Sequence, residues 1–171
     1  MTIRPRRADD LPACLEVLAE VHRQDGYPTR WPKDPAGWLD SPRLLGAWVA
    51  EEDGIVDGHI ALVAGVDDAQ LITAAGRPPA ELAMLSRLFV RSAARGRQLG
   101  EGFVSIATQV GSSRGLGLVL EVVNEPGSAA MALYERLGWQ LVGQRPASWT
   151  TASGDRPQLC LYLLSTTSPL T

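Results

Sequence analysis

The sequence contains little cysteine, and its cysteines are not spaced for shared chemistry. Cys14 and Cys160 are the two cysteines among 171 residues, and no C-x-x-C spacing occurs. Small secreted domains usually depend on several disulfides, whereas isolated thiols are common in a reducing compartment. We therefore expect free thiols and a cytoplasmic protein.

Long apolar runs and an excess of basic residues are absent as well. No run approaches the roughly 20 apolar residues of a membrane-spanning helix, and residues 1–5 lack the apolar core of a signal peptide. The formal net charge is -3 and no long basic run occurs, which argues against nucleic acid as a partner. We therefore expect neither a membrane nor a nucleic-acid partner.

The composition is that of an ordinary globular protein, with 45% hydrophobic and 20% charged residues. A chain of this length can bury one sizeable core, so we expect a single domain over residues 1–171. Apolar periodicity predicts strands at residues 2–4, 44–51, 55–63, 83–90, 118–123, 139–143 and 158–164. It predicts helices at residues 11–23, 99–114 and 129–137, one helical turn at 35–39, and a loop at 65–80. Asp9 or Asp10 is the expected N-cap of the first helix, and the whole pattern indicates an α/β fold with a mixed sheet.

Residues 85–103 join an apolar strand to an amphipathic helix through a turn containing Arg95, Gly96, Arg97 and Gly100. Such a turn leaves backbone N–H groups unpaired at the start of the helix, where the helix dipole is positive. This is a typical site for a phosphate or diphosphate. The turn has neither the Gly-Lys-Ser/Thr of a Walker loop nor G-x-G-x-x-G spacing. Because short motifs also match by accident, a turn that merely caps a buried helix stays open.

The turn resembles the acyl-CoA-binding motif of the GNAT N-acetyltransferase superfamily, Q/R-x-x-G-x-G/A, which follows a strand ending in Val. Val90 and the run from Arg95 to Gly100 fall in that register, with Gln98 in place of the family's first glycine. The resemblance implies that residues around the turn bind the coenzyme. These residues are Leu88, Phe89, Val90, Arg95, Gly96, Arg97, Gln98, Leu99, Gly100 and Glu101.

A second stretch is similar to another GNAT signature, A-x-x-x-Y-x-x-x-G-F/W. The matching residues are Ala130, Tyr134, Gly138 and Trp139. The resemblance implies that Tyr134 meets the CoA sulfur, where a phenol can protonate a leaving thiolate; a ring that only packs in the core is the alternative. The family often has an asparagine seven residues earlier, for the pantetheine arm. Gly127 stands there, which leaves Asn124 and Ser128 as the nearby candidates.

The resemblance also implies a fold and a reaction. The fold is a GNAT-like mixed, mostly antiparallel sheet of six to seven strands with helices on both faces. The reaction is N-acetyl transfer from acetyl-CoA, as co-substrate and without a metal, to an amine that attacks directly in a ternary complex. A non-catalytic acyl-CoA-binding or sensing domain of the same fold is the alternative function.

An amine is mostly protonated at neutral pH, so a proton must leave before attack. Glu121 is the candidate base because a carboxylate in an apolar strand can have a raised pKa, and Glu81 acting through water is the second candidate. Glu121 could equally serve only as a structural hydrogen-bond partner. The N–H near Val90 would polarise the acyl carbonyl, and proximity alone could supply much of the acceleration.

Residues 25–38 contain three prolines, two glycines and the rings of Tyr27, Trp31 and Trp38. The prolines preclude long regular structure, and the rings are costly to leave in water, so we expect a loop of fixed shape. It can form the wall of the acceptor site, cover an edge of the core, or do both.

The sequence does not identify the acceptor, which is expected to be a small-molecule or peptide amine. Trp48 could add another ring to its site, and Asp25, Asp34 and Asp40 could attract its positive charge. His22 and His59 are expected to be structural rather than catalytic. The final strands could also pair with a second copy, so a homodimer is open.

Overall fold

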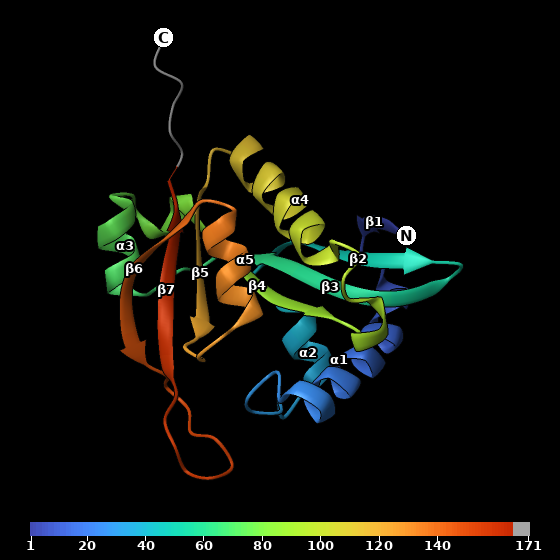
Figure 1. The fold of residues 1–171 in the computed structure, drawn as a ribbon. Coiled ribbons are helices and arrows are strands. Elements are labelled where there is room, and N and C mark those ends of the chain that lie inside the picture. The colour runs from blue at the N-terminus through green and yellow to red at the C-terminus, as the bar shows by residue number, and fades with distance from the viewer. Residues whose placement is uncertain (166–171) are drawn as a thin grey trace.

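Seven strands form one sheet within residues 1–165, the part of the chain that the computed structural model describes (Figure 1). Their order is β1-β2-β3-β4-β5-β7-β6, and of the neighbouring pairs in this described part β4 and β5 alone are parallel. The strands are β1 (Thr2–Pro5), β2 (Leu44–Glu52), β3 (Ile55–Val63), β4 (Leu82–Val90), β5 (Gly117–Val123), β6 (Trp139–Pro146) and β7 (Gln158–Leu164). The predicted mixed, mostly antiparallel sheet is thus confirmed, with β6 ending three residues later than expected.

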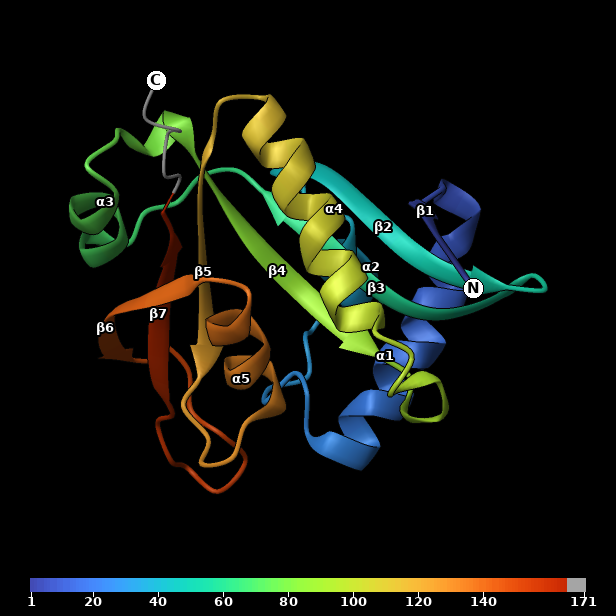
Figure 2. The same ribbon diagram turned by 45° about the horizontal axis from the view of Figure 1, so that its top comes forward.

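Helices cover both faces of this sheet (Figure 2). They are α1 (Leu11–Asp25), α2 (Pro35–Leu39), α3 (Ala69–Ala75), α4 (Leu99–Ser113) and α5 (Ala129–Arg136). On one face, α4 and α5 pack around Phe103 and Leu120, while α1 and α2 pack around Val49 and Phe89 on the other. The third helix, α3, covers Val119, which alternates with Leu120 along β5 and therefore belongs to the second face. No helix in residues 1–165 is long and apolar enough to cross a membrane.

Residues 69–75, which the sequence places in a loop, form α3 instead. The Asp68 carboxylate accepts the Leu71 N–H at 2.9 Å as the N-cap, and Leu71 is fully buried. Gly76, with a φ of 62°, ends the helix in the left-handed conformation. Seven residues make about two turns, too few for a helical period to be recognised in the sequence.

Asp10 is the N-cap residue of α1, one of the two positions expected, but its carboxylate is used elsewhere. Asp10 ends a short 3-10 turn, Ala8–Asp10, and its side chain caps no N–H of α1. Its carboxylate accepts two hydrogen bonds from the Arg4 guanidinium, at 2.7 and 2.8 Å, and one from the Arg7 N–H at 2.6 Å. The hydrogen bonds from Arg4 lower the pKa of Asp10 to about 2. This buried ion pair ties β1 to the start of α1.

The pairing of β4 with β5 is short, and β4 carries a bulge. Residues 82–84 pair with residues 117–119, after which the two strands diverge (Figure 2). The β3–β4 register shifts between His59 and Ala61, and Arg87 in the bulge has a φ of 55°. His59 is fully buried, with Nδ1 donating to the Arg87 carbonyl at 2.9 Å and Nε2 accepting from Arg6. As expected, this histidine is structural, and it holds the bulge in place.

Candidate active site

One cavity of about 1350 Å³ reaches both faces of the sheet where β4 and β5 diverge. A site for one small molecule usually encloses roughly 300–1000 Å³, so this cavity has room for a long ligand and a second molecule. On the face of α4 and α5 it is lined by residues 98–101 and 128–130. On the other face it is lined by residues 25–33 and 63–68, and residues 84–90 of β4 lie between them.

The start of α4 carries a row of free backbone amides at residues 96–101, and all of these residues except Arg97 line the cavity. Within residues 1–165, the N–H groups of residues 96–101 donate to no acceptor, and the first bond of the helix runs from Gly102 to Gln98 at 3.1 Å. Gly96 and Gln98 both have positive φ, 79° and 59°. A Cβ at Gly96 would meet nothing within 4 Å, so the space beside Gly96 is open, whereas a Cβ at Gly100 would lie 3.1 Å from the Leu133 side chain. Six free donors at the positive end of a 15-residue helix fit a diphosphate.

The two arginines of the turn are held by acidic side chains instead of standing free. Arg95 forms an ion pair with Asp25 and also donates to the Val90 carbonyl, at 3.2 and 3.3 Å. Arg97 pairs with Glu52 at 2.7 Å and does not line the cavity. The candidate anion site is therefore made mainly of backbone amides in the described residues, and Asp25 is neutralised by Arg95.

The edge of β4 that faces β5 offers one further donor. The Arg91 N–H points to β3, where it donates to the Asp57 carbonyl at 2.7 Å. Because backbone groups alternate along a strand, the Val90 N–H points to the opposite edge, where β5 is no longer paired. Leu88 and Val90 pack on the α4 face, whereas Phe89 packs on the α1 face.

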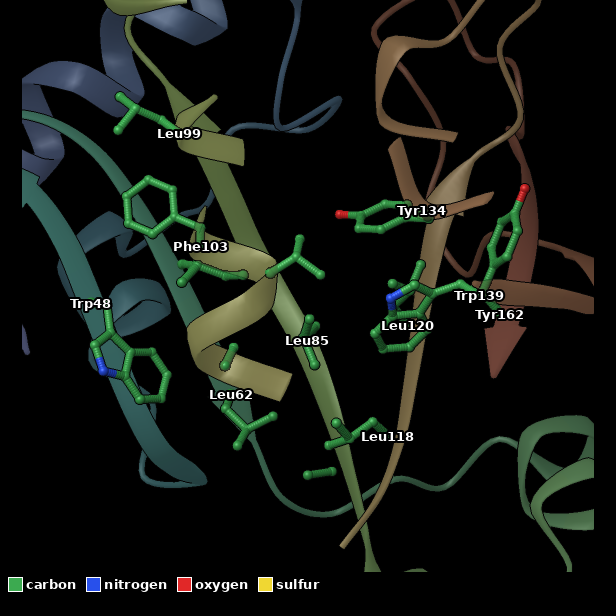
Figure 3. Close-up of a cluster of buried hydrophobic side chains, with 14 of the residues drawn as sticks. Trp48, Leu62, Leu85, Leu99, Phe103, Leu118, Leu120, Tyr134, Trp139 and Tyr162 are labelled. Atoms are coloured by element: carbon green, nitrogen blue, oxygen red, sulfur yellow. The ribbon is translucent and has the colours of Figure 1, made fainter. Parts of the chain in front are cut away.

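Tyr134 lies on α5 with its ring in the core and its hydroxyl at the cavity. Its ring centroid lies 6.1 Å from that of Trp139 and 6.3 Å from that of Tyr162. Figure 3 shows the hydroxyl turned away from these two rings, toward the side of Leu99 and Phe103 on α4. Burial raises the pKa of Tyr134 to about 12, so the phenol is protonated at neutral pH. The ring is therefore part of the core while Tyr134 also lines the cavity, and its contact with the CoA sulfur stays a prediction.

The two candidates for the pantetheine contact differ in position. Ser128 lines the cavity, and its hydroxyl accepts the Met131 N–H at 3.2 Å as the N-cap of α5. Asn124 lies outside the lining, and its N–H donates to the Gln158 carbonyl at 2.8 Å, next to the β5–β7 ladder. Glu101 also lines the cavity and pairs with Arg136 at 3.3 Å.

The aromatic segment of residues 25–38, which ends within α2, forms the wall of the cavity on the other face. Tyr27, Trp31 and Trp38 all line it, and Tyr27 and Trp38 also pack against the core around α1. This segment is therefore both a wall and a cover. Trp48 lies instead in the core on the α4 face, 5% exposed. Asp34 caps α2, and Asp40 pairs with Arg6 at 2.6 Å.

Glu121 reaches the cavity from β5 within a network of charged groups. It forms an ion pair with Arg145, which also pairs with Asp68 at 2.6 Å. Burial raises the pKa of Glu121, although the Arg145 charge opposes this shift. Glu81 lies outside the cavity at the far end of β4, where it pairs with Arg77 at 3.2 Å. Of the two candidate bases, only Glu121 reaches this cavity.

The lining also contains side chains that were not predicted from the sequence, among them Arg87, Arg145 and Trp149. Arg87 lies over the Trp38 ring, with its guanidinium carbon 4.8 Å from the ring centroid. Arg145 holds Glu121, and the Trp149 indole N–H donates to the Thr29 hydroxyl at 2.9 Å. An arginine inside an apolar strand was the available signal for Arg87, whereas Trp149 lies in a polar loop without a recognisable pattern. Residues 1–165 contain no group of three or more His, Cys, Asp or Glu side chains that could hold a metal ion.

Several solved structures share this fold at low sequence identity. The ribosomal-protein-S18-alanine N-acetyltransferase of Escherichia coli is 20% identical, with a TM-score of 0.71 over 99% of this chain and 97% of that chain. The yncA protein of Salmonella typhimurium, solved with its cofactor acetyl-CoA, is 19% identical, with a TM-score of 0.74 over 100% and 96%. NAA60 of Arabidopsis thaliana, solved in complex with acetyl-CoA, is 17% identical, with a TM-score of 0.71 over 95% and 96%.

Among curated proteins, none matches this sequence. The family comparison is more informative, because the acetyltransferase (GNAT) family matches residues 11–139. That range runs from the first residue of α1 to the first residue of β6, and so contains both the amide row and Tyr134. The chain therefore belongs to the GNAT family and is an acetyl-CoA-dependent N-acetyltransferase.

Proposed function

We propose that the acetyl group passes directly from acetyl-CoA to a primary amine inside the cavity, between Tyr134 and Glu121. The observation that carries this proposal is the continuity of the cavity across the sheet. The amide row and the Tyr134 hydroxyl line it from the α4 and α5 face, and Glu121 lines it from the other. Donor and acceptor can therefore bind at the same time and meet where β4 and β5 diverge.

Acetyl-CoA, the acetyl donor, would be held mainly by backbone groups of the protein. The free amides of residues 96–101 suit its diphosphate, and the unpaired edge of β4 near Val90 suits the amide-bearing arm that follows. When bound, the donor supplies an acyl group already activated as a thioester. The Val90 N–H is placed to polarise the acyl carbonyl, since it points to the edge of β4 that β5 leaves unpaired.

The acceptor ammonium loses one proton to Glu121 before attack, and Glu121 returns this proton to solvent. The neutral amine then forms a C–N bond as the C–S bond breaks, and the second proton lost by nitrogen reaches the departing sulfur through solvent. Burial prepares Glu121 to take the first proton by raising its pKa. Tyr134 donates a hydrogen bond to the sulfur as negative charge develops there. The products are an amide and a free thiol.

The test of this proposal is acetyl-CoA turnover against a panel of primary amines, with release of free thiol and the acetylated product both measured. The expected result is equal amounts of thiol and acetylated amine. Stabilisation of the protein by acetyl-CoA without thiol release from any amine would indicate an acyl-CoA sensor, and the proposal would be wrong.

The role of Glu121 is tested by Glu121→Gln. General-base catalysis typically contributes about 10²–10⁴-fold, so kcat/KM should fall by at least about 100-fold. In the wild type, kcat/KM should rise with pH as Glu121 loses its proton, and burial places this rise above the usual pKa of 4.5. The variant should lack this rise. Glu81→Gln is the control, because Glu81 lies outside the cavity. A Glu121→Gln enzyme with wild-type kcat/KM would mean that proximity alone suffices.

A further inference from the structure

We propose that the acceptor is a zwitterion, a small amino acid whose carboxylate binds Arg87 while its amine faces Glu121. This inference rests on the proposed function and names the substrate class of the same site. It starts from the unusual position of Arg87. The residue occupies the β4 bulge in a left-handed conformation, with a φ of 55°, and its guanidinium lies over Trp38 at the cavity wall.

The charge of Arg87 has no acidic partner within residues 1–165. Its Nη1 donates to the Ser86 hydroxyl at 3.0 Å, but its buried Nε has no acceptor, and none of the ion pairs of this part of the chain includes it. The half-buried Arg145 in the same cavity is instead held by Glu121 and Asp68. A cation that is partly removed from water without a counterion is unfavourable, and a bound anion would supply that counterion.

The diphosphate of the donor is not a suitable anion for Arg87. The amide row lies on the α4 face, whereas Arg87 stacks on Trp38, which packs with α1 on the opposite face. The anion at Arg87 therefore belongs to the acceptor. A guanidinium binds a carboxylate through paired N–H groups, and Trp38 holds the plane of the Arg87 group in one orientation.

The other end of the acceptor side is acidic. Asp67, Asp68 and Glu121 line it, and Arg145 forms ion pairs with Asp68 and Glu121. The exposed Arg43 lines it as well and donates to the Gly65 carbonyl at 3.3 Å, so three carboxylates stand against two guanidiniums. An ammonium group is favoured beside the three carboxylates, where Glu121 is the proposed base.

Arg30, Lys33 and Arg43 also line the acceptor side without an ion pair to any described residue, but they are exposed to water, whereas Arg87 is partly buried. Among the described residues, the acceptor side thus has a partly buried, unpaired cation on β4 and an excess of carboxylates toward β5 and α3, the complement of an amino acid. A polyamine would instead place positive charge against Arg87, which is unfavourable.

The test compares free L-amino acids with their carboxamides as acceptors, with thiol release measured at saturating acetyl-CoA. A hydrogen-bonded contact with a charged group corresponds to a change of about 10- to 100-fold in binding. Because a carboxamide also changes the basicity of the amine, the readout is the acid-to-amide ratio of kcat/KM in the wild type divided by that in Arg87→Met. We expect this quotient to be about 10 to 100, carried mainly by KM of the acid. Arg87→Lys, which keeps the charge but not the paired donors, should give an intermediate ratio.

Folding of Arg87→Met is checked by its thermal shift with acetyl-CoA, which binds on the other face and should be unchanged. If the variant fails to fold, the Arg87→Lys ratio and the wild-type preference for acid over amide still decide the question. An acid-to-amide ratio that is the same in wild type and Arg87→Met would overturn this inference. So would turnover of amides, peptides or polyamines without turnover of free amino acids. No thiol release with any amine would instead overturn the proposed function, and this inference with it.

Discussion

The clearest perturbation of the proposed mechanism is Tyr134→Phe. It removes one hydroxyl and keeps the ring that packs near Trp139 and Tyr162. Within residues 1–165 this hydroxyl has no hydrogen-bond partner, so its loss leaves no group unsatisfied. We therefore expect the variant to unfold at the same temperature as the wild type, and any change in turnover to come from the site.

The size of the effect follows from the pKa of Tyr134. Burial raises it to about 12, whereas a thiol of ordinary pKa is near 8.5. Full proton transfer from this phenol to a thiolate is thus uphill by roughly 3.5 pKa units, or about 5 kcal/mol. Tyr134 therefore acts by donating a hydrogen bond to the developing thiolate, which is worth about 1.5–3 kcal/mol. The expected loss in kcat is about 10- to 150-fold.

The assay is steady-state thiol release at saturating amine, with KM for acetyl-CoA expected to stay within about threefold, since one neutral hydroxyl adds little to ground-state binding. Tyr162→Phe is the matched control. It also removes one phenolic hydroxyl, which donates to Glu135 at 2.9 Å, and should cost about 1 kcal/mol of stability with kcat unchanged. A Tyr134→Phe enzyme within threefold of wild-type kcat would refute the role of Tyr134. A loss well above 10³-fold would refute the hydrogen-bond argument in favour of full proton transfer.

Two further substitutions test the turn and the start of the chain. Gln98 has a φ of 59°, a conformation that costs a residue with a side chain about 1 kcal/mol, so Gln98→Gly should lose no stability. Because the Gln98 side chain crowds the free amides, the same variant should bind acetyl-CoA more tightly, as measured by calorimetry. Gln98→Ala should bind acetyl-CoA as tightly as Gln98→Gly, but it should keep the backbone strain. Equal affinity in the wild type and both variants would contradict the idea that the Gln98 side chain crowds the amides. Asp10→Asn should lower the free energy of unfolding by about 2 kcal/mol at pH 7, because Arg4 lowers the pKa of Asp10 from 3.8 to about 2. This stabilisation is complete above pH 3.8 and is lost as the pH falls toward 2, so urea unfolding curves of the two proteins should converge there; a pH-independent difference would contradict it.

Apolar periodicity was sufficient to predict most of the fold. The strands and long helices carry apolar side chains on the face that packs against the core. In α1 these buried side chains are Cys14, Val17, Leu18 and Val21. The helix α3 was not predicted because seven residues are too few to show a helical period. It is stabilised by one capping hydrogen bond from the Leu71 N–H to Asp68 and by burial of the Leu71 side chain. The order of strands around β5 and β7 was not predicted, since periodicity does not say which strands pair.

The candidate site could be predicted from the sequence only where its residues are consecutive in the chain. The amide row depends on a continuous run of residues, so the turn indicated it directly. The partners of its arginines could not be predicted, since Arg95 meets Asp25 at a separation of 70 residues and Arg97 meets Glu52 at 45. Glu121 was recognised as a carboxylate in an apolar strand, but its pairing with Arg145 depends on β5 and β6 lying on either side of β7.

The bulge in β4 connects the shape of the cavity with its charge. His59 donates to the Arg87 carbonyl and accepts from Arg6, and Arg6 in turn donates to the Leu39 carbonyl and to Asp40. Leu39 and Asp40 follow Trp38 directly, so the same chain of hydrogen bonds fixes both the arginine and the ring beneath it. Burial lowers the pKa of His59 to about 4, so the imidazole ring stays neutral at physiological pH and its two hydrogen bonds stay intact. The Arg87 cation at the proposed acceptor wall is therefore held in place by the fold before any acceptor binds, which is the preorganisation that selective binding requires.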